Sequence, residues 1–394
     1  MINKRIDRSK DNRVMNDIII ATLLCLPLIN DIIASCFKIE FGISAPLMGM
    51  FLIYSFLKNG FCISWFQFAI TFIIIVFFLM SFVRYNINVH NIEYLKNFLY
   101  YGILPIIFVN NRHDGERILR IMSYIAIVAI ITWLTKEVSI YEYGENMKYS
   151  NMLLPGGLAV MYQAFINKSN TKYVKALYIA VFILYINLMI SWGTRGCLLA
   201  VVVYPLLIFL SGSRKERLVL FLLTATIGFF MIMKLENILL MLRDFLNGFG
   251  IDFIGLNRTI TLLISDNLSN GRFDIWLLSK NMILNSGLLG MGISGFELIT
   301  NNYTHNLFLQ LLIEFGPLVG SIFILGIIYF IVKAVTMKNS EINKNFLILL
   351  LASSIIILQF SSTHWFFVSF WFFIYECYKL SKKLKATIVH RKLQ

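Results

Sequence analysis

The sequence predicts an all-α polytopic membrane protein, and three observations support this class. The chain of 394 residues is 58% hydrophobic and has a mean hydropathy of +0.74. Only 14% of its residues are charged, whereas soluble domains carry roughly 25%. Its apolar stretches run for close to 20 residues, which is long enough to cross a bilayer as helices, and they lack the alternation of β-barrel strands.

The apolar stretches predict about 12 transmembrane helices within a single membrane domain, residues 1–394. We expect these spans near residues 17–36, 43–57, 61–83, 92–109, 118–134, 151–167, 176–192, 197–211, 217–233, 305–332, 346–360 and 364–378. Because no internal repeat is visible, the sequence does not favour a solenoid.

The distribution of basic residues predicts how the chain is oriented. If the N-terminus is cytoplasmic, most of the 35 Lys and Arg residues fall in inside segments, and every short inside loop is basic. Both termini are then cytoplasmic, and one long loop, residues 234–304, lies outside. This loop is too apolar for a disordered linker, so we expect short amphipathic helices there. Membrane orientation also explains the net charge of +14, so no nucleic-acid partner is expected.

The first candidate for chemistry is His305, at the outer end of a predicted span. Imidazole exchanges a proton near neutral pH. Thr304 before it is a candidate helix N-cap, and Asn306 after it could bind a substrate hydroxyl. The competing explanation is that these three residues only cap a helix at the membrane edge. His364, at another predicted outer edge, is the competing histidine.

Several cations are predicted on the same outer side. Arg195 lies at the junction of two spans, where arginine is costly and usually functional or paired. Arg272 and Lys280 are eight residues apart and could share a helix face. Arg84 and Arg258 are also outside. A guanidinium fork suits pyrophosphate; the alternative is that each arginine extends to lipid phosphates.

The remaining polar features point to no metal and no cofactor. Glu314 lies inside a span and needs a partner, either an arginine or helix packing, and we assign it no catalytic role. The GLLGMGISG run lacks the ending of a P-loop and predicts a tight turn whose amides could face an anion. The five cysteines form no CxxC pair. A metal-assisted mechanism through Asp31 and Glu40 stays open as an alternative.

Together these residues resemble the O-antigen ligase/polymerase superfamily of bacterial inner-membrane glycosyltransferases. The resembling features, within residues 191–316, are Ser191…Thr194-Arg195-Gly196, Arg272…Trp276, the turn Leu289-Gly290-Met291-Gly292 and the block His305-Asn306…Glu314-Phe315-Gly316. The chain departs from the family where Ser286-Gly287 stand in place of a proline before the glycine turn. A second departure is Gly193-Thr194, which stand where the family has Ser-x-Ser before the arginine.

The resemblance implies a GT-C-like bundle with its active site on the periplasmic face of the inner membrane. It implies metal-independent, inverting transfer from a glycan on undecaprenyl pyrophosphate. Arg195 and Arg272 would hold the pyrophosphate, and His305 would accept or position the proton of the acceptor hydroxyl. Further substrate contacts would come from the other candidates, Asn306, Arg258, Arg84 and Lys280.

Three activities remain open after the resemblance. A polymerase of the Wzy type, which joins lipid-linked repeat units, is favoured. An O-antigen ligase of the WaaL type, which transfers the polymer to lipid A–core, is the alternative, and a lipid-linked oligosaccharide flippase or transporter is the third. Inner-membrane lipids and a chain-length regulator protein are candidate partners.

Overall fold

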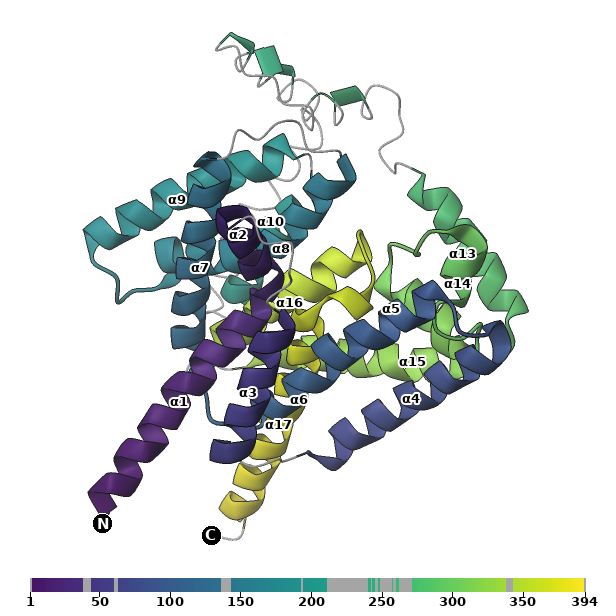
Figure 1. Ribbon diagram of the computed structural model, residues 1–394, viewed down its shortest axis with the longest axis horizontal. Coiled ribbons are helices and arrows are strands. Elements are labelled where there is room, and N and C mark those ends of the chain that lie inside the picture. The colour runs from purple at the N-terminus through teal and green to yellow at the C-terminus, as the bar shows by residue number, and fades with distance from the viewer. Residues whose placement is uncertain are drawn as a thin grey trace.

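The computed structural model describes residues 2–37, 44–59, 63–135, 143–192, 194–210, 271–337 and 343–392, with a few isolated positions between 240 and 261. Every regular element within these segments is a helix (Figure 1). The predicted all-α class is therefore confirmed for this part of the chain.

The first half of the chain forms a series of helices. Their bounds are α1 Ile2–Leu24, α2 Leu26–Phe37, α3 Ser44–Asn59, α4 Trp65–Tyr85, α5 Val89–Asn97, α6 Leu104–Val109, α7 Gly115–Thr135, α8 Tyr143–Met161, α9 Lys172–Ser191 and α10 Arg195–Leu210. A π-helical segment, Phe98–Ile103, joins α5 to α6 without a break.

The second half contains the segment with most of the candidate residues. Its helices are α13 Arg272–Asn285, α14 Gly295–Thr300, α15 Leu307–Thr336, α16 Lys344–Leu351 and α17 Val368–Lys392. Helices α13 and α14 occupy the end of the predicted outer loop. The part of that loop before residue 271 lies outside the described residues, apart from the isolated positions.

The apolar helices fit an α-helical membrane protein. Among the described residues, four helices are long and apolar enough to cross a membrane: Trp65–Tyr85, Val89–Val109, Lys172–Ile190 and Leu307–Thr336. The pair Asn12–Leu24 and Leu26–Ala34, bent by 72°, raises this number to five if it forms one span. The predicted span at 217–233 lies outside the described residues, and the count of about 12 stays a prediction.

Helix α16 forms the centre of the molecule. Six consecutive residues, Phe346 to Leu351, are each no more than 1% exposed. A helix that is apolar on every face must be surrounded by other helices. Figure 1 shows α16 between the group α7–α10 and the group α13–α15, so α16 connects the two halves of the bundle.

An ion-pair cluster joins α1, α7 and α17 at one end of the bundle. The buried His113 ring contacts the Glu376 carboxylate at 3.1 Å, and the Lys379 ammonium lies 3.8 Å from the same carboxylate. Arg117 pairs with the buried Asp17 at 3.2 Å. Because paired charges are retained only where hydrogen bonds or opposite charges compensate them, this cluster gives the predicted basic loops a structural role.

Candidate functional site

The site is built around a break in α15. Gly316 has non-helical backbone angles of φ 76° and ψ 168°, and Pro317 follows it. Proline has no N–H group to donate to the carbonyl four residues earlier, which is that of Ile313. The break therefore leaves carbonyl groups of α15 without partners inside the helix.

The glycine-rich turn supplies those partners. The Met291 amide donates to the Ile313 carbonyl at 2.7 Å, and the Gly292 amide donates to the Glu314 carbonyl at 3.1 Å. Gly290 has φ +71°, and a Cβ atom there would lie only 2.4 Å from the Gly316 nitrogen. The expectation that this turn presents its amides to an anion is wrong for these two amides, because they satisfy the broken helix.

His305 occupies a strained turn just before α15. Its φ is 51°, in the left-handed region that residues other than glycine rarely adopt. The helix N-cap is Asn306, whose side-chain oxygen accepts from the amides of Phe308 at 3.0 Å and Leu309 at 3.1 Å. The sequence predicted Thr304 as the cap, and this is wrong because the turn at His305 delays the start of the helix by two residues.

The Thr304 side chain instead contacts Gln310, the centre of a buried polar network. The Gln310 side-chain oxygen accepts from the Thr304 hydroxyl at 2.9 Å. Its side-chain nitrogen donates to the carboxylates of Glu297, at 2.8 Å, and Glu314, at 2.6 Å. Since a primary amide has one acceptor and two donors to satisfy, these bonds fix its orientation and, through Thr304, the turn that carries His305.

Aromatic side chains complete the network. Tyr94 donates its hydroxyl to Glu297 at 3.0 Å, and the Trp365 indole donates to Glu314 at 2.9 Å. The Trp276 indole donates to the Thr304 carbonyl at 3.0 Å. These donors come from α5, α13 and the segment before α17, so the His305 turn is supported from three directions.

Glu297 and Glu314 form a coupled pair of buried acids. Glu297 is 3% exposed and Glu314 is fully buried. Both accept from one nitrogen, and no Lys or Arg of the described residues lies within 4.0 Å of either carboxylate. Burial raises the pKa of Glu297 above its ordinary value, and two close buried carboxylates cannot both ionise. The pair therefore favours one proton held between its two carboxyl groups.

His305 itself is neutral at physiological pH and has a free nitrogen. Burial and the nearby Arg272 guanidinium lower the pKa of His305 to about 4. Its Nδ1 atom is buried and has no hydrogen-bond partner among the described residues. The centre of the imidazole ring lies 4.5 Å from the centre of the Tyr303 ring. A neutral imidazole with an unused nitrogen beside a guanidinium can accept a proton next to a bound anion.

The structure brings some of the predicted cations to this site. Arg272 begins α13 and is half-buried, while Lys280 on the same helix is exposed. Arg84, at the end of α4, donates to the Gly290 carbonyl at 3.0 Å and so holds the glycine turn. Arg195 is the first residue of α10, but its side chain lies outside the described part of the chain. Arg258 also lies outside the described residues.

Sequence analysis missed several residues of the network. Gln310 and Glu314 are four residues apart on one helix, and this spacing could have revealed their contact. Glu297 and Tyr94 carry no such signal, because their contact depends on how α14 packs against α5. For Glu314, the structure shows glutamine and indole partners together with His364, whose ring nitrogen lies 3.8 Å away, rather than an arginine.

Of the two carboxylates considered for a metal, only Asp31 lies within the described residues. Within the described residues, no three His, Cys, Asp or Glu side chains lie close enough to share an ion. Asp31 accepts from the Trp133 indole at 2.6 Å, and Glu40 lies outside the described residues.

The sequence matches no model of a known protein family and no curated protein, and the structure matches no solved structure. The function must therefore be argued from the site.

Proposed function

We propose that the protein is a glycosyltransferase that polymerises oligosaccharide repeat units linked to undecaprenyl pyrophosphate in a bacterial inner membrane. One observation carries this proposal: His305 is neutral, has a free nitrogen, and lies beside Arg272 in a turn fixed by a buried network. This arrangement pairs a proton acceptor with a cation for a diphosphate at the membrane edge.

In the proposed reaction, a hydroxyl group of the acceptor glycan attacks the anomeric carbon of the donor. A new glycosidic C–O bond forms as the bond to the pyrophosphate oxygen breaks, with inversion at carbon. His305 accepts the hydroxyl proton, while Arg272, with Arg195, stabilises the charge on the departing diphosphate. The proton then leaves to solvent or to the diphosphate, which restores the neutral imidazole.

The low pKa of His305 is compatible with this role. A base with a pKa near 4 is weak, because an efficient base has a pKa near the working pH. A bound diphosphate offsets the charge of Arg272, and that charge is one of the two causes of the lowered pKa. Donor binding would therefore raise the pKa of His305 and strengthen the base when it is needed.

The test uses the surface polysaccharide of a strain from which the gene has been deleted. Lipopolysaccharide gels are compared after restoration with the wild type or with His305→Ala. A polymerase requires core that carries a single repeat unit in the deletion strain and in the variant, and a ladder with the wild type. Core without repeats, with polymer left on the carrier lipid, would instead identify a ligase. An unchanged ladder would contradict both transferases.

A further inference from the structure

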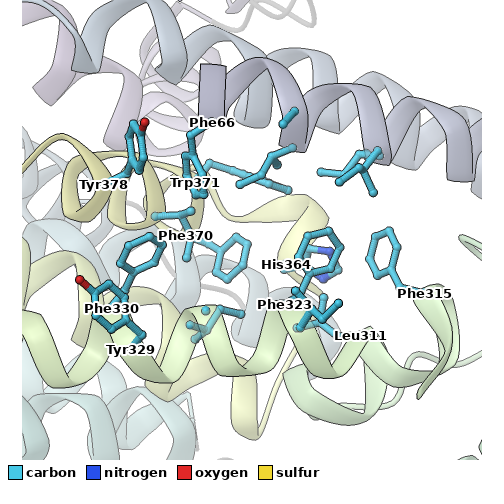
Figure 2. Close-up of a pocket in the computed structure, with 18 of the residues that line it drawn as sticks. Phe66, Leu311, Phe315, Phe323, Tyr329, Phe330, His364, Phe370, Trp371 and Tyr378 are labelled. Carbon is cyan, nitrogen blue, oxygen red and sulfur yellow. The ribbon is translucent and has the colours of Figure 1, made fainter. Parts of the chain in front are cut away.

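A long apolar cavity lies between α4, α15 and α17. It has a volume of about 720 Å³, within the roughly 300–1,000 Å³ typical of ligand pockets. Figure 2 shows its aromatic lining, with Tyr329, Phe330 and Tyr378 toward one end and Leu311, Phe315 and His364 toward the other. Its walls are almost entirely hydrocarbon, so its occupant must be apolar as well.

Aromatic pairs at both ends hold α4 away from its neighbours. Phe66 stacks on Tyr378 with ring centroids 4.1 Å apart, and Phe77 meets Phe315 at 4.9 Å. Between these contacts, Ile70 and Ile73 face the cavity. These ring contacts separate α4 from the helices opposite it and leave the cavity between them.

The cavity is long and narrow along α15. Its lining after the break in α15 extends from Ile322 to Phe330, a separation of roughly 12 Å in a regular helix, and Leu311 and Phe315 before the break continue it. At Gly326 a Cβ atom would meet nothing within 4 Å. These dimensions suit one extended hydrocarbon chain better than a compact ligand.

The two ends of the cavity differ in charge. Lys382 lines one end, is exposed, and has no carboxylate within 4.0 Å in the described part of the chain. Lys333 lies near the same end, 5.8 Å from the centre of the Tyr329 ring. The buried His364 lines the other end and lies 3.8 Å from a Glu314 carboxylate oxygen. An anionic head group is therefore stabilised at the lysine end alone.

We propose that this cavity binds one acyl chain of an anionic glycerophospholipid, with the lipid phosphate at Lys382. The second acyl chain would remain in the bilayer. The isoprenoid chain of a lipid-linked donor is the competing occupant, but its pyrophosphate would be needed near Arg272, beyond the opposite end of the cavity. The proposal does not depend on the transferase activity, because it rests on the cavity and its lysines.

Trp371 lines the cavity and provides the signal for the test. The full chain is reconstituted in phosphatidylcholine vesicles that contain a small fraction of a lipid with brominated acyl chains, which quench indole fluorescence on contact. Quenching is measured for brominated phosphatidylglycerol and brominated phosphatidylcholine. The part of the quenching that Trp371→Phe removes belongs to the cavity. We expect this part to be larger for phosphatidylglycerol. The affinity derived from it should be about fivefold higher than that for phosphatidylcholine, which is what one lysine–lipid contact provides.

Two matched pairs of variants separate the chain from the head group. Gly326→Leu places a side chain in the cavity from a position where a Cβ atom is unobstructed and should abolish the Trp371 signal for both lipids. Gly49→Leu, also at an open position but outside the lining, should preserve it. Lys382→Gln should remove the preference for phosphatidylglycerol. Lys172→Gln, at an exposed lysine on α9, should retain it.

Three outcomes would overturn the proposal. The first is equal quenching by the two lipids in the wild type. The second is a Trp371 signal unaffected by Gly326→Leu. The third is displacement of brominated phosphatidylglycerol by undecaprenyl phosphate at equal or lower concentration, which would assign the cavity to the isoprenoid chain. The lipopolysaccharide gel is independent of these measurements, so failure of the transferase proposal can be distinguished from failure of the lipid-binding proposal.

Discussion

At the scale of single residues, the backbone of His305 and its chemistry can be tested separately. His305 has φ 51°, and asparagine is among the few residues that tolerate this region. His305→Asn should keep the turn and the thermal stability but lose the proton acceptor. We expect transfer to fall by about 10²–10⁴-fold, the usual contribution of a general base. Measured transfer of a lipid-linked repeat unit by purified protein checks this, and near wild-type activity in His305→Asn would remove His305 from the mechanism.

The charge of Arg272 sets part of the acidity of His305. Burial and Arg272 both lower the pKa of His305, to about 4. Both disfavour the protonated ring, so removing the guanidinium must raise the pKa toward the ordinary value of about 6.5. As the pH is lowered, the rate at which diethyl pyrocarbonate modifies His305 should therefore begin to fall at a higher pH in Arg272→Gln than in the wild type. Lys280→Gln, at an exposed position, is the control; an equal shift there would contradict a specific effect of Arg272.

At the scale of elements, the glycine turn and the helix break form one unit. Gly287 and Gly290 have φ +75° and +71°, but only at Gly290 would a Cβ atom meet backbone, 2.4 Å from the Gly316 nitrogen. Gly287→Ala should cost about 1–2 kcal/mol through strain alone. Gly290→Ala should cost clearly more, because it also separates the turn from α15. Thermal unfolding of the two purified variants in the same detergent provides the comparison, and equal stabilities would show that the turn does not depend on this contact.

The polar network is a second element whose stability can be measured. Gln310→Leu removes the donor to both carboxyl groups and the acceptor of Thr304, and each buried group left unsatisfied costs about 1–3 kcal/mol. Glu297→Gln should be nearly neutral, since the acid pair already retains a proton and an amide oxygen can accept the same bonds. A strongly destabilised Glu297→Gln protein would mean that the proton of the pair does not reside on Glu297.

At the scale of the whole molecule, some features followed from the sequence and others required the fold. Helices were predictable because long apolar segments must satisfy their own backbone groups in lipid. Residue type and position singled out His305 and Arg272, and the fold places the two side chains near each other. The bend of 72° between the first two helices has a sequence signal in Pro27, the second residue of α2, although the hydropathy pattern predicts one span over residues 17–36. The contact of Tyr94 with Glu297 joins residues far apart in the chain, and only tertiary packing determines it.

The orientation of the whole chain is the last prediction. Helix α15 has 30 residues and is long and apolar enough to cross a membrane, so we expect its ends on opposite sides of the bilayer. The basic loops predict that His305 faces the periplasm. Asn302 and Lys168 are exposed and are predicted to lie on opposite sides, so each is replaced by cysteine in a Cys36→Ser, Cys62→Ser background. The other native cysteines, Cys25, Cys197 and Cys377, are buried.

A membrane-impermeant maleimide should label the Asn302→Cys protein in intact spheroplasts, and the Lys168→Cys protein only after lysis. The reverse pattern would place His305 in the cytoplasm. Lipid-linked polymerisation at the outer face would then be excluded, because the proposed proton acceptor and the donor would be separated by the bilayer. Labelling of both variants before lysis would mean that the two turns share a side and would contradict the predicted alternation of spans between them. The maleimide experiment thus tests the positive-inside argument and the location of the site together, without requiring any activity.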